Sequence, residues 1–247
     1  MCNLYLNVVT GKSIITAVKK TLLSIFAHSD DELAAIGTIA NHAKRGDRII
    51  MACMTPGTRT SFLDGTDEEK RAARTKQAEE VAKLVGAEAR CLDFEDTAIY
   101  PSREASLKVA ELIREIKPTI IITWNQLWAT GPGHPDHRYT SVIVLDAVSY
   151  ARFKIPEISL PPYREIISLY LAPGLPTSPF PLCYVDISTQ EKLIRQFTSI
   201  YEKMYGPWQA LNLKLASSAV NGFSLGCELA ESFNVIQRGS SEAKYLD

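Results

Sequence analysis

Three of the four histidines of this chain lie in two short acidic segments, each placed where a predicted strand gives way to a helix. The first segment, Ala27 to Glu32, reads Ala-His-Ser-Asp-Asp-Glu, and the second, Gly133 to His137, reads Gly-His-Pro-Asp-His. Two histidines with one carboxylate form a catalytic zinc site that leaves one coordination position open for water. A metal ion in such a site lowers the pKa of its water to about 7, and a neighbouring carboxylate can accept the proton. The two segments therefore indicate a hydrolytic metal centre.

Each segment, taken alone, also has a purely structural explanation. Asp30, Asp31 and Glu32 are typical of a helix start, where they would cap the helix and complement its dipole. The segment around His134 could be an exposed loop. Together the segments favour a site, because they supply complementary ligand types at one edge of the predicted sheet. The fourth histidine, His42, lies in a polar stretch and is predicted to be a surface helix residue.

Short apolar runs alternate with longer amphipathic segments along the chain. The predicted strands are Thr21–Ala27, Arg48–Met54, Ala89–Phe94, Thr119–Trp124, Arg164–Ala172 and Tyr184–Ile187. The predicted helices are Glu32–Lys44, Asp67–Val85, Ser102–Lys117, His137–Tyr150 and Gln190–Tyr205, with a helix and a short strand expected after Leu211. This alternation predicts an α/β fold with a Rossmann-like doubly wound, mostly parallel sheet and helices on both faces.

No composition shift or internal repeat divides the chain, and a single domain over residues 1–247 is predicted. A catalytic core would span about residues 20–160 and a C-terminal elaboration about residues 161–247. In doubly wound sheets, ligands bind beyond the carboxyl ends of the strands. That rule directs attention to the loops after Ala27, Met54, Phe94 and Trp124. The loop Thr55–Gly65 is interpreted either as a lid over the site or as an ordinary surface loop. Trp124 is expected in the core because it ends an apolar strand.

Composition excludes several classes of function. The formal net charge of −1 gives no reason to expect a nucleic acid or an acidic membrane as partner. The five cysteines, Cys2, Cys53, Cys91, Cys183 and Cys227, are far apart, which favours free buried thiols over a disulfide framework or a cysteine metal site. Met1 to Ile15 does not resemble a signal peptide, and the apolar runs are shorter than the ~20 residues of a membrane span. We therefore expect a cytoplasmic protein, with assembly into a homo-oligomer left open.

The chain resembles the zinc-dependent PIG-L/LmbE-like de-N-acetylases of N-acetylglucosamine-containing substrates. The first motif of that family is AHPDDE, which stands here as AHSDDE from Ala27 to Glu32. The second motif, HPDH, is intact from His134 to His137. Weaker similarities are Arg74 in the helix that ends Leu84-Val-Gly86, and Ala230-Glu-Ser-Phe233, which is similar to the AEAF segment of the family. The resemblance covers most of the chain from Thr21 to Val235.

The resemblance implies a role for each matching residue. Zinc would be bound by His28, Asp31 and His137, although ferrous iron, cobalt or manganese would also suit this ligand set. Asp30 would be the general base, His134 would face the developing oxyanion, and Asp136 would hold one of the histidines in orientation. Arg74 would contact the substrate, and Glu32 would support the loop through hydrogen bonds.

Two departures from the family pattern concern the surroundings of these residues. Ser29 replaces the proline of the first motif, and Gln77 replaces a glutamate three residues after Arg74. Neither change removes a metal ligand. The departures place the identity of the substrate, rather than the type of reaction, in question.

The function predicted from these features is removal of an N-acetyl group from a small amino-sugar molecule or glycoconjugate. One alternative keeps the site but changes the bond, as in an amidase acting on a thiol–sugar conjugate. Another is a non-catalytic protein that binds a sugar or a metal, which would not require Asp30. A nucleotide-binding Rossmann protein is disfavoured, because the turn after Ala27 has no GxGxxG and its carboxylates would repel phosphate.

Overall fold

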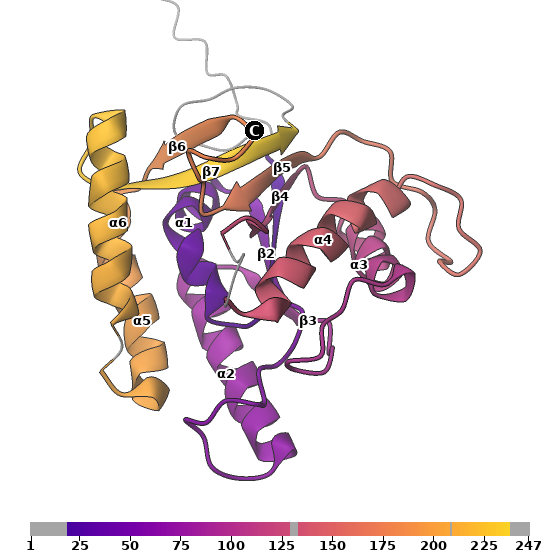
Figure 1. Cartoon of the computed structure of the whole chain (residues 1–247), viewed down its shortest axis with the longest axis horizontal. Helices are drawn as coiled ribbons and strands as arrows, with labels where there is room; N and C mark the ends of the chain where they lie inside the picture. The colour runs from indigo at the N-terminus through magenta and orange to yellow at the C-terminus, as the bar shows by residue number, and fades with distance from the viewer. Residues whose placement is uncertain (1–18, 129–132, 208, 238–247) are drawn as a thin grey trace, which may run out of the picture.

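The computed structural model describes residues 19–128, 133–207 and 209–237, within which seven strands form one sheet flanked by helices (Figure 1). The strands are β1 (Thr21–Phe26), β2 (Arg48–Cys53), β3 (Glu88–Cys91), β4 (Ile120–Trp124), β5 (Ser168–Ala172), β6 (Leu182–Asp186) and β7 (Ala230–Gln237). The α-helices are α1 (Ile36–Arg45), α2 (Asp67–Val85), α3 (Arg103–Ile116), α4 (Pro135–Tyr150), α5 (Glu191–Tyr205) and α6 (Ala210–Leu225). None of these helices is long and apolar enough to cross a membrane.

The strand order is β3-β2-β1-β4-β5-β7-β6. Strands β3, β2, β1, β4 and β5 run parallel, and β7 pairs antiparallel with both β5 and β6. The first strand, β1, lies in the middle of the sheet. The next two strands continue outward to β3, and the chain then returns to the other side of β1 as β4. The mostly parallel, doubly wound sheet predicted from the sequence is thus confirmed, with a switch point between β1 and β4, where such folds bind ligands.

Helices cover both faces of the sheet. Helices α1, α2 and α5 contact one another on one face, and α3 packs with α4 on the other (Figure 1). Strands β1 and β4 are buried along almost their whole length, which explains their continuous apolar sequences. The β5 strand, which belongs to the predicted C-terminal elaboration, pairs directly with β4. The boundary between core and elaboration remains a prediction.

The sequence predicted a helix from Glu32 onward, but the segment after β1 does not enter a regular helix at once. A single 3-10 turn, Asp31–Ala34, comes first, and α1 begins only at Ile36. The backbone N–H groups of Gly37 and Thr38 donate to the carboxylate of Glu231 on β7, at 2.9 and 2.8 Å. The start of α1 is therefore capped by a residue almost two hundred positions away, which sequence patterns do not reveal.

The prediction that His42 is a surface residue is wrong. Its side chain is completely buried, and its Nδ1 lies 2.7 Å from Oδ2 of Asp47. Arg45 donates to the same carboxylate from Nη2 at 2.7 Å. Gly46, with a φ of 92°, ends α1 in the left-handed conformation and turns the chain so that Asp47 returns beside the helix. A polar local sequence therefore forms a buried cluster.

The cysteines are only partly as predicted. Cys53, Cys91, Cys183 and Cys227 are all free thiols, but of these only Cys53 is buried. Cys91 is exposed because β3 forms the edge of the sheet, where residues lack a covering strand. Cys2 and the rest of the segment Met1 to Ile15 lie outside the described residues.

Candidate functional site

The two acidic segments meet at the switch point of the sheet. The first follows β1 directly, so that His28 and Asp31 lie just beyond its carboxyl end. The second begins α4, with His134 as the N-cap residue and His137 in the first turn. Residues 129–132 of the intervening loop lie outside the described ranges. The fold thus brings together side chains that are more than one hundred positions apart in the sequence.

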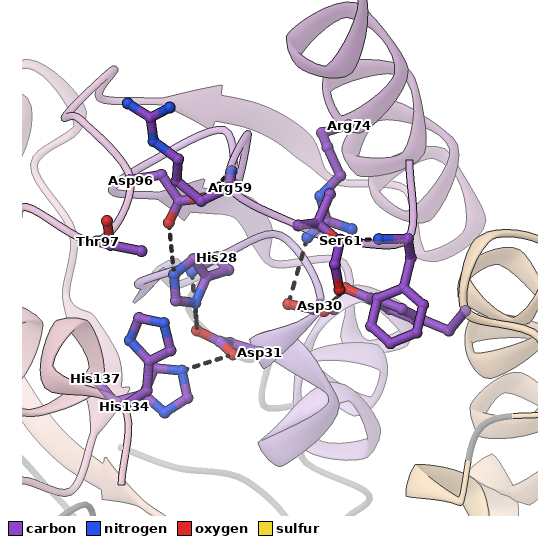
Figure 2. Close-up of a pocket in the computed structure, with 14 residues that line it drawn as sticks. His28, Asp30, Asp31, Arg59, Ser61, Arg74, Asp96, Thr97, His134 and His137 are labelled. Carbon is purple, nitrogen blue, oxygen red and sulfur yellow. Dashed lines mark hydrogen bonds and ion pairs between the residues drawn. The ribbon is translucent and has the colours of Figure 1, made fainter. Parts of the chain in front are cut away.

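Asp31 lies between two histidines (Figure 2). Its Oδ2 is 3.4 Å from Nδ1 of His28, and its Oδ1 is 3.3 Å from Nε2 of His137. One ligand atom from each of the three residues lies within 4.8 Å of the others. Nitrogen and oxygen donors that converge at these distances fit a divalent ion such as zinc, because each would need to move little to coordinate it.

The Asp31 carboxylate also accepts two hydrogen bonds. The backbone N–H of His28 and the indole Nε1–H of Trp124 both donate to its Oδ2, each at 2.9 Å. Trp124 is buried, as predicted, and its ring stacks on the imidazole of His137 at 4.4 Å. One core residue thus fixes the carboxylate by a hydrogen bond and one histidine by stacking.

The other ring nitrogen of His28 faces two further carboxylates. Its Nε2 lies 3.3 Å from Oδ1 of Asp96 and 3.4 Å from Oδ2 of Asp136. Asp136 is buried and also accepts a hydrogen bond from the backbone N–H of Thr97 at 2.9 Å. The carboxylate of Asp136 therefore faces His28, and neither of the two histidines of its own HPDH motif.

Burial and the neighbouring charges shift the pKa values of His28 and Asp31 in opposite directions. Burial lowers the pKa of His28, but Asp31 and the other carboxylates outweigh it, and the pKa is raised well above its usual range. Burial raises the pKa of Asp31, but His137 and His28 outweigh it, and the net shift is downward. The carboxylates around His28 therefore favour positive charge at this position, which a bound cation would also supply.

Asp30 points to the opposite side of the loop from Asp31, toward α2 and α5. Its Oδ1 is 3.5 Å from Nη2 of Arg74, and its Oδ2 accepts a hydrogen bond from the hydroxyl of Tyr205. Arg74 is only 2% exposed and donates from Nη1 to Oε1 of Gln77 at 3.1 Å. The amide that replaces the family's glutamate therefore still provides Arg74 with an acceptor.

His134 is exposed at the mouth of the site. Its Nδ1 accepts the backbone N–H of Asp136 at 3.2 Å. The neutral ring therefore carries its proton on Nε2. Burial, and then the charges of His28 and His137, lower the pKa of His134. His134 can nevertheless donate a hydrogen bond from Nε2 while it is neutral.

One oxygen of the Glu32 carboxyl does not give the support expected of this residue. The side chain is buried, and burial raises its pKa well above the usual range. Its Oε2 has no hydrogen-bond partner among the residues that the structure describes. The predicted support of the loop therefore does not come from this oxygen.

A cavity of about 390 Å³ opens above these side chains. The predicted residues His28, Asp30, Asp31, Arg74, His134 and His137 line it (Figure 2). The loop Thr55–Gly65 contributes Gly57 and residues 59–62, so it forms one wall of the cavity. Gly57 has a φ of 71°, and a Cβ there would lie 3.2 Å from Nε of Arg74, which explains why the loop passes so close to this guanidinium.

Outside the loop Thr55–Gly65, sequence reasoning missed three residues that line the cavity, namely Asp96, Thr97 and Tyr205. The rule about carboxyl ends of strands had indicated the loop after Phe94, and that loop carries Asp96 and Thr97. No comparable signal marks Tyr205, which ends α5 in the C-terminal part of the chain.

The sequence of the chain matches a protein family and two characterised relatives. The profile of the family described as PIG-L: GlcNAc-PI de-N-acetylase matches residues 23–148, just over half of the chain. The chain is 29% identical to diacetylchitobiose deacetylase of Thermococcus kodakarensis over 135 residues, which are 53% of this chain and 50% of that protein. It is 25% identical to 4-oxalmesaconate hydratase of Pseudomonas putida over 112 residues, 42% of this chain and 43% of that protein. These matches span about half the length of either relative.

The similarity extends to three dimensions. The solved structure of N,N'-diacetylchitobiose deacetylase from Pyrococcus horikoshii has a TM-score of 0.75 and 24% identity, and the match covers 88% of this chain and 84% of that one. The sheet and helices described above are therefore those of a known fold.

Proposed function

We propose, because the chain belongs to the PIG-L family of GlcNAc-PI de-N-acetylases, that it is a metal-dependent hydrolase that removes an N-acetyl group. The substrate would be a small molecule or glycoconjugate that contains N-acetylglucosamine. The observation that carries this proposal is the position of Asp31 between His28 and His137, with Asp30 on the wall of the same cavity. The deacetylase name of one relative supports the choice of bond.

His28, Asp31 and His137 would hold the metal, for which zinc is the first choice and iron, cobalt or manganese are alternatives. A second group, His28 with His134 and Asp136, also brings its donors within 4.8 Å. We favour the first group, because its three residues are the ligands that the family resemblance implies. When bound, the ion would polarise the amide carbonyl and make a water molecule acidic.

The remaining steps belong to side chains of the chain itself. Asp30 would take the proton from the attacking water, as its place in the cavity wall allows. His134 would donate a hydrogen bond from Nε2 to the developing oxyanion. The leaving amine would receive the proton that Asp30 took from the water, or one from His134 after that ring has itself been protonated, which releases acetate and the free amino sugar. Asp136 would keep His28 in orientation, and Arg74 would contact the substrate from beside Asp30.

The test is acetate release by the purified protein from a panel of N-acetylglucosamine conjugates that includes diacetylchitobiose, with metal content measured on the same sample. Asp30→Asn should keep the metal but lose about 10²–10⁴-fold in kcat. Asp146→Asn, at an exposed position on α4, is the matched control and should behave as wild type. Full turnover by Asp30→Asn would contradict the assignment of the base.

The same preparation distinguishes the alternatives. Stoichiometric metal without acetate release would move the proposal to another amide, such as that of a thiol–sugar conjugate. Hydration of 4-oxalmesaconate, the reaction named for the second relative, would instead place the chain with that hydratase. Absence of both metal and turnover would favour a sugar-binding protein.

A further inference from the structure

Tyr205 has no part in the proposed reaction, yet it contacts the proposed base directly. Its hydroxyl donates a hydrogen bond to Oδ2 of Asp30, from a position 175 residues later in the chain. The phenol of a tyrosine, with an ordinary pKa of about 10, keeps its proton at neutral pH, so the carboxylate of Asp30 is the acceptor. The other oxygen of Asp30, Oδ1, faces Arg74. The carboxylate is therefore held at both of its oxygens.

The ring of Tyr205 is itself fixed by its neighbours. Phe62 packs edge-on against it at 5.0 Å with an interplanar angle of 89°, and Tyr201 lies 6.4 Å away on the preceding turn of α5. The guanidinium carbon of Arg74 lies 6.0 Å from the ring centre. These contacts come from three different segments of the chain. They define where the hydroxyl points, as a precisely placed hydrogen-bond donor requires.

We propose that Tyr205 is a positioning residue that orients the carboxylate of Asp30 for proton transfer. This inference rests on the proposed role of Asp30 as general base. A carboxylate can rotate about its Cβ–Cγ bond, and a hydrogen bond to Oδ2 fixes its plane. The hydrogen bond uses one lone pair of Oδ2 and leaves others directed at the cavity that Asp30 lines. Misplacement of a reacting group by about 1 Å can cost about 10²-fold in rate.

The size of the effect follows from what remains when the hydroxyl is removed. Arg74 still faces Oδ1, so the Asp30 side chain keeps one of its two contacts. We therefore expect Tyr205→Phe to lower kcat about 10- to 100-fold, which is less than the loss expected for removal of the base itself. The KM should change little, because the hydroxyl is directed at Asp30.

The experiment compares Tyr205→Phe with Tyr163→Phe in the full-length, metal-loaded protein, using diacetylchitobiose as the probe. Tyr163 is a matched control because its hydroxyl also donates hydrogen bonds, to the carbonyl oxygens of Lys117 and Pro118 at 3.2 and 3.1 Å. These residues precede β4 and so lie at the amino-terminal ends of the parallel strands, whereas the site lies beyond their carboxyl ends. Crystal structures of wild type and Tyr205→Phe supply a second readout, the orientation of the Asp30 carboxylate.

The expected result is a fall in kcat for Tyr205→Phe with KM and metal content unchanged, wild-type kcat for Tyr163→Phe, and a rotated Asp30 carboxylate in the first variant. An unchanged kcat, or a raised KM at unchanged kcat, would overturn the inference. If the wild type itself releases no acetate, the proposed function fails, and the crystal structures still decide about Tyr205. An Asp30 carboxylate in the same orientation in both structures would then reject its positioning role.

Discussion

Replacement of Trp124 by phenylalanine tests whether the core of the protein tunes the proposed metal centre. The change removes the indole Nε1–H that donates to Oδ2 of Asp31 at 2.9 Å. It retains an aromatic ring between Phe26, at 5.2 Å, and His137, at 4.4 Å. The Asp31 side chain is only 9% exposed, so water has little room to replace the lost donor.

The magnitude follows from the charge of the acceptor. A hydrogen bond to a charged group contributes about 1.5–3 kcal/mol, and loss of such a partner behind a metal ligand weakens metal affinity about 10- to 100-fold. We therefore expect the dissociation constant for Zn²⁺ to rise by that factor in Trp124→Phe. The measurement is a competition titration of zinc between the protein and a chromophoric chelator, which reports binding without any assumption about the substrate.

Trp128→Phe is the control for this titration. Trp128 stacks on the outer side of Trp124 at 4.9 Å, and its own side chain is 48% exposed. Its replacement changes the aromatic stack but leaves the donor to Asp31 in place. An unchanged zinc affinity in Trp124→Phe, or an equal loss in both variants, would refute the idea that the indole N–H matters to the site.

Three further predictions concern stability. Gly37→Ala should lower the free energy of unfolding by about 1–3 kcal/mol in urea denaturation, because the new Cβ would lie 2.8 Å from Cβ of Ile187, and an unchanged midpoint would contradict this packing. Burial opposes ionisation of Asp47, but hydrogen bonds from His42 and Arg45 outweigh it and lower the pKa of Asp47 from 3.8 to about 2. The ionised carboxylate therefore stabilises the fold above pH 4, and this stabilisation is lost as the pH falls to 2. Acid titration followed by circular dichroism should show a weaker dependence in Asp47→Asn, and an identical acid limb would speak against the buried cluster. Removal of metal by a chelator should lower the melting temperature, and excess Zn²⁺ at about 100 times its dissociation constant should restore about 2.7 kcal/mol, whereas indifference to both additions would argue against a metal site.

Several properties of the protein were determined by local sequence alone. The apolar runs of β1 and β4 predicted buried parallel strands, because a strand covered on both faces of the sheet has apolar side chains on both sides. Strand–helix alternation predicted the doubly wound sheet, and the rule that ligands bind beyond the carboxyl ends of strands located the site. The family resemblance implied His28, Asp31 and His137 as metal ligands, and each lies within a few residues of a strand end or a helix start.

Other properties were decided only by the tertiary structure. His42 looks like a surface residue in its polar stretch, and it is buried because Gly46 returns Asp47 to its side. Tyr205 looks like the last residue of an amphipathic helix, and it reaches Asp30 because α5 packs beside the loop that follows β1. Contacts of this kind depend on how elements pack across the sheet, and no spacing along the chain records them. The sequence by itself therefore determined the two acidic segments of the candidate site, and packing decided which of their atoms face one another and which further residues join them.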